Sequence, residues 1–403
     1  MKFSKIGHVS LVSAIALILA SAFTACNPVT IDYLFVAGQK GDSSGNGQIQ
    51  TFLVDRVSGA LEIFNSTVSS GGVTPVSEAV ATDYSHLYVA NQGDSTLVEF
   101  TINGGKLESS KTITLDAEGN TPVAITMNGS GTLLYVASTY QPGCTTAIPT
   151  AKSCNGGALA VFPVGTDGSL GSAITNGTLS YWPVGINPTA VNALASGSAV
   201  YVTSYDPGAG IGYVNGFSAT SAGALSSLGA FQAGVKPVGI ASDPTSRFVY
   251  ATDFSQNQLI AYSIIGGASL HPLINGPFRT GNQPSALTID PRGHFIYVSN
   301  RLDNTISAYS IDLSTGSPTA AVNTTGQVAN STGTAPVAVL VDPSFGRFVY
   351  SANLFDNSVT GFLLNSSTGT LSPSQNGPYP SIGAPVALAA VPRGNHSIQV
   401  NQP

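Results

Sequence analysis

The stretch PSALTIDPRGHFIYVSNRLDNTISAY, which covers residues 284–309, contains the pattern that decides the fold of this chain. A proline opens a short apolar segment, Asp290 and Pro291 begin a turn, and Ile296–Asn300 is rich in β-branched and aromatic residues. Asp and Pro favour tight turns, because Pro restricts φ and the Asp side chain accepts backbone hydrogen bonds. Segments rich in Val, Ile and Tyr and bounded by turn residues are typical of strands. The stretch therefore predicts consecutive short β-strands.

The element at Ile296–Asn300 is one of seven copies in the chain. The others are Leu34–Gly38, Leu87–Asn91, Leu134–Ser138, Val200–Ser204, Val249–Asp253 and Val349–Asn353. Each copy is followed by a strand with an aromatic residue in register, and then by a Gly-x-Leu-like segment such as Gly369-Thr370-Leu371. Prolines spaced 47 to 66 residues apart open the remaining strand: Pro75, Pro122, Pro188, Pro237, Pro284, Pro336 and Pro385. Four short strands repeated at this period are typical of β-propeller blades.

The order of the strands predicts how the ring closes. We label the strands of a blade A to D from the inside outward, with the proline strand as A and the five-residue element as B. The chain then begins with strands B, C and D at residues 33–68 and ends with a lone A strand near Pro385. Pairing of these two ends gives an all-β, seven-bladed β-propeller with four antiparallel strands per blade and no exposed sheet edge. We expect this single domain at 33–395, between a linker at 26–32 and a C-terminal tail at 396–403.

The N-terminus has the pattern of an export signal. Two lysines precede an apolar stretch at 9–23, and small residues lead to Cys26. A basic start, a short apolar region and a small-residue cleavage site predict a signal peptide at 1–25. The sequence Phe-Thr-Ala-Cys resembles a bacterial lipobox, so we expect Cys26 to be acylated in an exported cell-envelope lipoprotein, in the outer membrane or facing the periplasm. The alternative is ordinary secretion after cleavage at a small residue.

Cysteine and charge content narrow the function classes. In an oxidising compartment, Cys144 and Cys154 are close enough in sequence to favour one local disulfide, and none of the five His lies between them to suggest a metal site. Only 8% of the residues are charged, the net charge is -6, and no run of Lys or Arg is present. This composition argues against nucleic acid as a partner. Because a closed ring has no need to oligomerise, we expect a monomer.

The repeats resemble those of the lactonase, or 6-phosphogluconolactonase-like, family of seven-bladed β-propellers and of the related YVTN-repeat proteins. The likeness lies in the Tyr-Val-Ser-Asn strands, the Asp-Pro-x-x-x-Arg-Phe turn at Asp342 and the Thr-Gly-x-Leu third strands. The resemblance implies that the B–C and D–A loops share one face, around the channel mouth where active sites of propeller enzymes generally lie. It also implies lactone hydrolysis, although propellers serve as passive binders too. No catalytic residue of the family can be carried over by position.

Positive charges on this face could bind an anionic substrate. Lys236 and Arg279 come shortly before A-strand prolines, and Arg301 lies in a B–C loop. Arg binds carboxylate or phosphate in a bidentate manner. The B–C loops also carry Asn and Asp residues, among them Asp303, that could form a ring around a hydroxylated ligand or a cation. The alternatives are solvated loop charges and Asx-type hairpin turns.

Aromatic residues are concentrated near the blade with the longest repeat. Its B–C loop runs from 138 to 157, and Tyr140, Tyr181, Trp182 and Tyr205 lie in or near loops of the same face. We expect these rings to converge on one sector of the mouth, where they could stack on a sugar or lactone ring. The alternative is that they pack the long loop against the body of the protein.

Glu78 breaks the A-strand pattern. Three residues after the proline, the other six blades have apolar residues: Ile125, Val191, Ile240, Leu287, Val339 and Leu388. A carboxyl group at such a packed position needs a hydrogen-bond partner or a raised pKa. Glu78 is therefore a candidate catalytic acid or base. A structural glutamate with satisfied hydrogen bonds is the alternative.

Two functions from different classes follow. The first is hydrolysis of a non-phosphorylated, sugar-type lactone at the channel mouth, with water or Glu78 as the base and with Arg279 and Arg301 stabilising negative charge on the opening ring. Phosphorylated sugar lactones are cytoplasmic, so an exported protein would rarely meet them. The second is a non-catalytic propeller, attached to the membrane only through its lipid, that binds a carbohydrate-like ligand or an envelope protein. Neither function calls for a cofactor.

Overall fold

The computed structural model describes residues 29–143, 156–322, 326 and 328–394. The signal peptide, the acylated Cys26 and the pairing of Cys144 with Cys154 lie outside these residues and remain predictions. Within the described ranges, no helix has the length and apolar character needed to cross a membrane.

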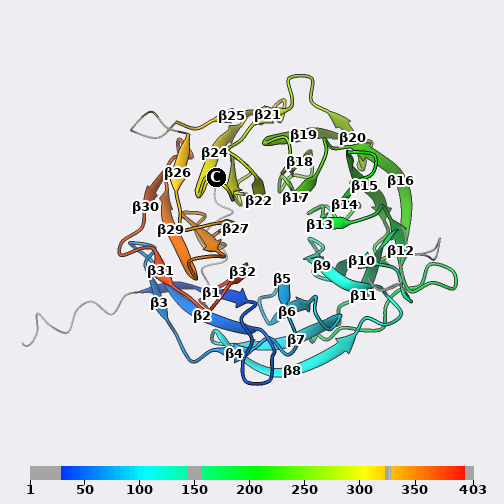
Figure 1. The fold of residues 1–403 in the computed structure, drawn as a ribbon, viewed down its shortest axis with the longest axis horizontal. Coiled ribbons are helices and arrows are strands. Elements are labelled where there is room, and N and C mark those ends of the chain that lie inside the picture. Colours follow the sequence, from blue (N-terminus) through cyan, green and yellow to red (C-terminus); the bar gives the residue numbers. More distant parts are fainter. Residues whose placement is uncertain (1–28, 144–155, 323–325, 327, 395–403) are drawn as a thin grey trace, which may run out of the picture.

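Seven sheets are arranged in a ring around a central axis (Figure 1). The innermost A strands are β5 (Pro75–Val80), β9 (Asn120–Met127), β13 (Pro188–Ala193), β17 (Pro237–Ser242), β22 (Pro284–Ile289), β27 (Pro336–Val341) and β32 (Pro385–Pro392). The B strands are β1 (Thr30–Gly38), β6 (His86–Asn91), β10 (Leu133–Tyr140), β14 (Ala199–Asp206), β18 (Phe248–Asp253), β23 (Phe295–Asn300) and β28 (Phe348–Asn353). The C strands are β2 (Gln48–Asp55), β7 (Thr96–Asn103), β11 (Gly157–Pro163), β15 (Ile211–Ala219), β19 (Gln258–Ile265), β24 (Thr305–Ile311) and β29 (Ser358–Leu364).

The outermost D strand is continuous in three blades and divided in four. The continuous strands are β8 (Lys106–Thr114), β12 (Trp182–Val184) and β16 (Leu225–Gln232). The divided strands are β3 (Leu61–Ile63) with β4 (Val68–Ser69), β20 (Ser269–Pro272) with β21 (Phe278–Arg279), β25 (Pro318–Ala320) with β26 (Ala329–Ser331), and β30 (Leu371–Pro373) with β31 (Tyr379–Pro380). Both parts of each divided strand pair with the same C strand. The seven-bladed fold with four antiparallel strands per blade is confirmed.

The ring closes as expected, by pairing of the two ends of the propeller. Strand β1 pairs with β32 in a register that runs from Asp32 opposite Pro392 to Gly38 opposite Pro385. All nine residues of β1 are buried. The strand begins at Thr30, inside the stretch expected to be a linker, because the Ile31 side chain is fully buried in the core between two blades.

The tyrosines of the repeated B strands join neighbouring blades. In five blades the phenol donates a hydrogen bond to a backbone carbonyl in the C–D turn of the next blade, at distances of 2.6 to 3.0 Å. The pairs are Tyr88 with Gly168, Tyr201 with Ala268, Tyr250 with Gly316, Tyr297 with Gly369, and Tyr350 with Gly59. Burial raises the pKa of these phenols, so they remain donors. The repeat therefore specifies contacts between blades as well as strands.

The glycine of the Gly-x-Leu segment allows close contact with the preceding blade. Gly369 has a φ of 74°, and a Cβ atom there would lie 2.2 Å from the ring of Phe295. Gly316 has a φ of 76° and would meet Phe248 at 2.3 Å. A larger residue would be strained by the left-handed backbone and would clash with a buried aromatic ring.

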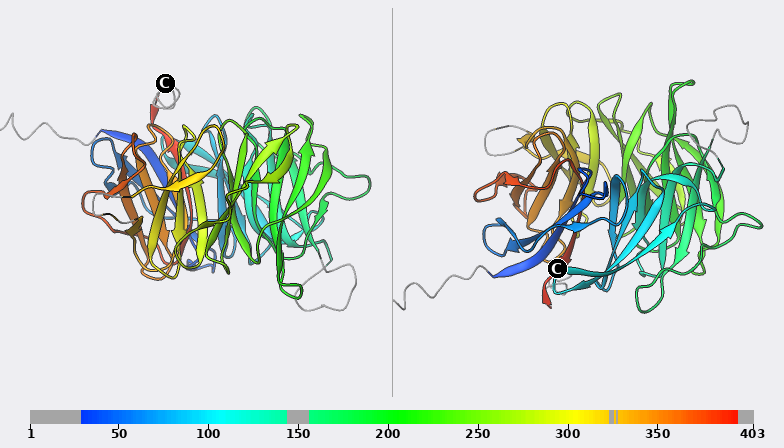
Figure 2. Two further views of the ribbon diagram at one scale, coloured as in Figure 1. Left: turned by 90° about the horizontal axis from the view of Figure 1, so that it is seen from above. Right: turned by 60° about the horizontal axis from the view of Figure 1, so that its bottom comes forward.

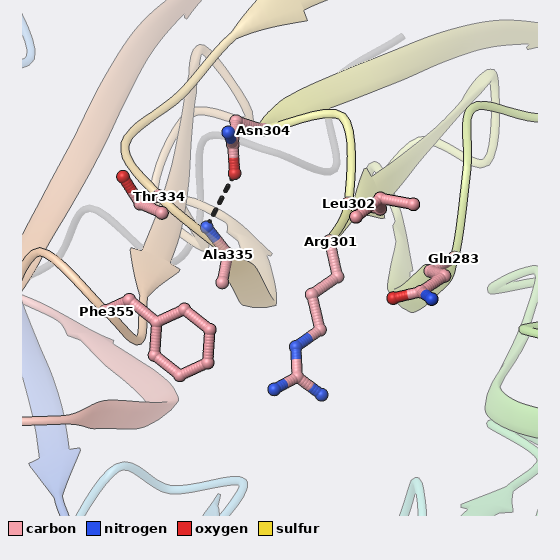
Figure 3. A pocket seen from close by; sticks show the side chains of 7 residues that line it. All are labelled: Gln283, Arg301, Leu302, Asn304, Thr334, Ala335 and Phe355. Carbon is pink, nitrogen blue, oxygen red and sulfur yellow. Dashed lines mark hydrogen bonds between the residues drawn. The ribbon is translucent and has the colours of Figure 1, made fainter.

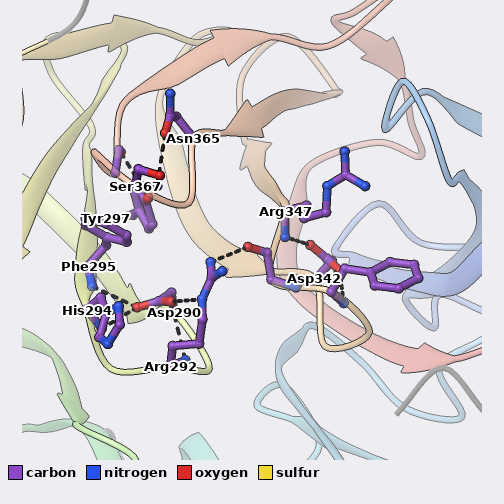
Figure 4. A network of polar contacts seen from close by, with 12 residues as sticks. Asp290, Arg292, His294, Phe295, Tyr297, Asp342, Arg347, Asn365 and Ser367 are labelled. Atoms are coloured by element: carbon purple, nitrogen blue, oxygen red, sulfur yellow. Dashed lines mark hydrogen bonds and ion pairs between the residues drawn. The ribbon is translucent and has the colours of Figure 1, made fainter. Parts of the chain in front are cut away.

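The A–B turns are structural (Figure 4). Asp290 accepts hydrogen bonds from the backbone N–H groups of His294 and Phe295, at 2.6 and 2.7 Å, and forms an ion pair with Arg292 at 3.0 Å. Arg292 also donates to the Gly346 carbonyl of the next blade, at 2.9 Å. Arg347, in the equivalent turn, instead stacks on Phe348 at 5.9 Å. Figure 2 shows the ring from the side, with strands running between this face and the face of the B–C and D–A loops.

Candidate functional site

The D–A loops that enter β22 and β27 are each held by side chains from the two blades that they join. In the loop that enters β22, the N–H of Gln283 donates to Asn257 of the preceding blade at 2.8 Å. The adjacent N–H of Asn282 donates to Asp303 of the following blade at 2.7 Å. The loop that enters β27 repeats this arrangement, with Ala335 bound to Asn304 at 2.8 Å and Thr334 bound to Asp356 at 2.7 Å. These hydrogen bonds fix the positions of both loops on the rim.

Hydrogen bonds of this kind account for the Asn and Asp residues that recur in the B–C loops. Both carboxylate oxygens of Asp303 accept hydrogen bonds from Asn282. Asp94 accepts from the N–H of Val73 at 3.0 Å, and the buried Asp253 accepts from five donors. Each of these side chains joins its own B–C loop to a neighbouring D–A loop, so its role extends beyond closing a hairpin turn. In this structure Asp303 holds the D–A loop that enters β22 in place.

A cavity of about 450 Å³ opens between the blades of β22 and β27 (Figure 3). Its volume is within the range of roughly 300–1,000 Å³ that is usual for small-molecule sites. Arg301, Gln283, Leu302 and Phe355 contribute side chains to its wall. Figure 3 shows the Arg301 guanidinium directed into the centre, between Phe355 and Gln283. The guanidinium carbon lies 5.4 Å from the centre of the Phe355 ring. We call this cavity the Arg301 pocket.

The positive charges of this sector lack acidic partners. In the described part of the chain, the only Lys or Arg that lies within 4.0 Å of a carboxylate is Arg292, on the opposite face. Lys236 lies between two rings, with its ammonium 5.2 Å from the centre of Tyr205 and 5.0 Å from that of Phe254. Arg279 is exposed and lines a separate cavity of about 280 Å³. Arg279 and Arg301 are therefore available to contact an anionic group of a bound ligand.

The four predicted aromatic residues have different environments. Trp182 is only 5% exposed, packs in the core between two blades and donates its indole N–H to the Leu225 carbonyl at 3.0 Å. Tyr181 is 9% exposed, whereas Tyr140 is half-buried at the end of β10. Tyr205 contacts Lys236 instead. Trp182 and Tyr181 are thus core residues, and their rings are not available for stacking on a ligand.

Glu78 is a half-buried residue of the innermost strand β5. Both of its carboxyl oxygens are buried and have no hydrogen-bond partner among the described residues. Burial raises the pKa of this carboxyl to about 8. Its cross-strand neighbour is Val89, which belongs to the apolar cluster between this blade and the closing blade of β1 and β32. The group is therefore mostly protonated at neutral pH.

The structure does not bring Glu78 and the two arginines together. Glu78 is on the blade of β5, whereas Arg301 is three blades away in the ring, on the blade of β22. Figure 1 shows β5 and β22 on opposite sides of the central opening. Glu78 is also three residues below the rim, a distance of roughly 10 Å along a strand. A lactone bound at Arg301 is consequently out of reach of this carboxyl group.

Gln283, Leu302 and Phe355 line the Arg301 pocket and were not identified from the sequence. Their positions in the repeat could nevertheless have been used to identify them. Gln283 directly precedes an A-strand proline, and the other two follow B strands by two residues. Both positions lie in the loops next to the A-strand prolines and the ends of the B strands, at the mouth of the ring.

Two other features of the described residues are less suited to a site. A cavity of about 1050 Å³ lies near the opposite face, beside Val29. Its Asp55 is engaged in turn hydrogen bonds to Val57 and Ser58. Among the described residues, no three His, Cys, Asp or Glu side chains lie together in a way that could hold a metal ion. The Arg301 pocket is therefore the strongest candidate site.

Comparisons with known proteins agree with this architecture. A family model described as "Lactonase, 7-bladed beta-propeller" matches residues 34–189 and 268–389. The structure is similar to that of a periplasmic gluconolactonase of Pseudomonas aeruginosa, with 18% identity, a TM-score of 0.70 and coverage of 91% of this chain and 100% of the other. It is also similar to a candidate 6-phosphogluconolactonase of Bacteroides uniformis, with 17% identity, a TM-score of 0.70 and coverage of 90% and 100%. No curated protein matches the sequence.

Proposed function

The chain belongs to the lactonase family of seven-bladed β-propellers, and on this basis we propose that it hydrolyses a sugar-type lactone without a phosphate group in the Arg301 pocket. The observation that carries this proposal is the guanidinium of Arg301, which has no carboxylate within 4.0 Å among the described residues and is directed into a cavity of about 450 Å³. Phe355 supplies an apolar surface for the sugar ring, and Gln283 supplies an amide for its hydroxyl groups. The similarity to gluconolactonase-like structures supports the fold that presents these groups.

The proposed reaction requires little from the protein beyond orientation and positive charge. A water oxygen bonds to the lactone carbonyl carbon, and the carbonyl electrons move to its oxygen. Arg301 stabilises this oxyanion by a charge-assisted hydrogen bond. The tetrahedral intermediate then breaks the ring C–O bond, the ring oxygen takes up a proton, and the second water proton leaves to solvent. The product is a hydroxy acid in its carboxylate form.

Replacing Arg301 tests this function. We expect Arg301→Ala to lower kcat/KM for glucono-δ-lactone by roughly 100-fold, because removal of one oxyanion donor costs about 10²–10³ in rate. Arg301→Lys keeps the charge but loses the bidentate geometry, so it should retain intermediate activity. The measurement is acid release in a pH-stat, corrected for spontaneous hydrolysis.

Two control variants make the result specific. Lys106→Ala removes an exposed positive charge from the outer strand β8 and should leave turnover unchanged. Glu78→Gln should also retain turnover, because Glu78 is three blades away from Arg301. A folded wild-type protein that does not exceed the spontaneous rate would overturn the proposed function. Full activity of Arg301→Ala would instead place the reaction elsewhere.

A non-catalytic role has one observation in its favour. Leu302 and Phe355 are 61% and 65% exposed and line the same pocket on the rim. Such residues suit the binding of a carbohydrate-like ligand or an envelope protein. This alternative gains weight if the folded protein shows no lactone turnover.

We further propose that the protein is an exported lipoprotein, on the sequence of residues 1–26. Radiolabelled palmitate should be incorporated into the wild-type protein in cells and should be absent from Cys26→Ser. The variant should move from the membrane fraction to the soluble fraction, because Cys26 carries the only proposed anchor. Equal labelling of both proteins would contradict the assignment.

A further inference from the structure

We propose that the rim beside the Arg301 pocket binds a saccharide chain that is attached to the lactone and carries an acidic sugar at its far end. This inference rests on the proposed function of the Arg301 pocket and extends it. It defines the substrate class as the lactone end of an acidic oligosaccharide.

Three cavities adjoin one another along the rim, since neighbouring cavities share wall residues. The Arg301 pocket shares Gln283 and Leu302 with a second cavity of about 280 Å³. The second cavity shares Asn257 and Asn282 with a third, also of about 280 Å³. Each of the two smaller cavities is close to the lower limit, roughly 300 Å³, for a small-molecule site. A linked series of compact units fits such a row better than one bulky ligand.

The third cavity is lined mainly by amides. Four of its seven lining residues are Asn or Gln. Three of these amide side chains form hydrogen bonds within the protein. In the described part of the chain, each of the three still has one polar group without a partner. Asn257 accepts from Gln283 at 2.8 Å and keeps its NH₂ group, whereas Asn282 donates to Asp303 at 2.8 Å and keeps its oxygen. Gln258 donates a hydrogen bond to the buried Asp253 of its own blade at 3.2 Å, and its side-chain oxygen has no partner among the described residues.

This arrangement of amides fits sugar hydroxyl groups. A hydroxyl group is both donor and acceptor, and the row offers both kinds of partner at oriented positions. Oriented groups lose little entropy on binding, so they contribute more to affinity than mobile side chains. An extended peptide fits less well, because the cavities lie on loops and provide no sheet edge for backbone pairing. Phe254 lines the second cavity and adds an aromatic surface, which suits a sugar ring.

Arg279 supplies the charge at the far end of the row. Its side chain is exposed, lines the third cavity and has no carboxylate within 4.0 Å in the residues described. Its backbone is fixed by pairing opposite Gln258 and by the hydrogen bond that its carbonyl accepts from Tyr309 at 2.7 Å. A guanidinium on a fixed strand is a suitable partner for a uronate carboxylate.

The test uses trigalacturonate and its methyl ester, in which each carboxylate is replaced by an uncharged ester of slightly larger size. We expect the full-length protein to bind the acid about tenfold more tightly than the ester in isothermal titration calorimetry. Arg279→Gln should remove this difference, since a charged hydrogen bond is lost. Gln256→Ala should weaken the binding of both probes, because it removes an amide of the third cavity without touching a structural bond. Lys106→Ala is the matched charge control.

The outcomes separate this inference from the proposed function, because trigalacturonate contains no lactone. Absence of binding to folded wild-type protein would overturn the inference, even if glucono-δ-lactone is hydrolysed. Equal affinity of wild type, Arg279→Gln and Gln256→Ala would overturn it as well. Binding that depends on these residues, without any lactone turnover, would support the saccharide site and overturn only the proposed function. Thermal unfolding of each variant confirms that its fold is intact.

Discussion

Removal of strand β32 by truncation after Ala384 is expected to abolish folding of the whole propeller. The strand provides the A position of the closing blade and pairs with β1 over its full length. Its loss would expose the edge of β1, all of whose residues are buried, and would take three residues, Ala387, Ala389 and Val391, from one apolar cluster. The lost burial and unpaired backbone groups together exceed the stability of a typical domain, roughly 5–15 kcal/mol.

The matched control is truncation after Gly394, which leaves every described strand in place. This protein should keep the wild-type unfolding midpoint in circular dichroism. The shorter protein should lack a cooperative transition and should aggregate, because an exposed strand edge pairs with other chains. A monomeric, cooperatively folded protein after truncation at Ala384 would show that closure is dispensable.

The second large effect is a loss of stability as the pH rises, caused by Glu78. Its carboxyl has a pKa of about 8 in the folded protein, against 4.5 for the ordinary group. Below pH 4.5 both states hold the proton, so Glu78 has no effect there. Between pH 4.5 and about 8 only the folded state holds it, and the free energy of unfolding falls by about 1.4 kcal/mol per pH unit. Above pH 8 the loss is complete.

Glu78→Gln removes this titration, so its stability should depend much less on pH in that window. Urea unfolding at several pH values measures the difference between the two proteins. Burial and the nearby Asp342 raise the pKa of Asp32 well above its usual range. In both proteins, Asp32 therefore adds a decrease in the free energy of unfolding as the pH rises. Glu108→Gln changes an exposed carboxyl and should behave like wild type. Parallel curves for wild type and Glu78→Gln would show that the buried carboxyl is stabilised in its charged form.

The repeated pattern allowed the architecture to be predicted from local information. The proline, the Tyr-containing B strand and the Gly-x-Leu turn each determine backbone geometry over a few residues. Seven copies of the same pattern then leave a ring as the arrangement that buries every blade face. Even Glu78 was detectable, because it departs from six equivalent apolar residues. Its raised pKa follows directly from that position.

The site was only partly predictable, because it depends on which side chains from separate blades meet. Arg301 was identified by its charge, but Phe355 comes from the next blade and has no distinguishing motif. Trp182 was expected at the mouth, yet its short strand turns the indole into the core. The type of a residue indicates which contacts and chemistry its side chain can provide, whereas the direction in which the side chain points depends on strand register.

The sequence by itself determined the strand pattern, the number of blades and the closure of the ring, since these depend on periodic local preferences and on burial of apolar faces. The tertiary structure decided which charges remain unpaired, where the rim is hollow and which polar residues are used up in holding loops. Asp303 and Asn257 illustrate the reason. Their hydrogen bonds join loops that are more than 20 residues apart in sequence, so only the assembled ring shows that they orient the rim.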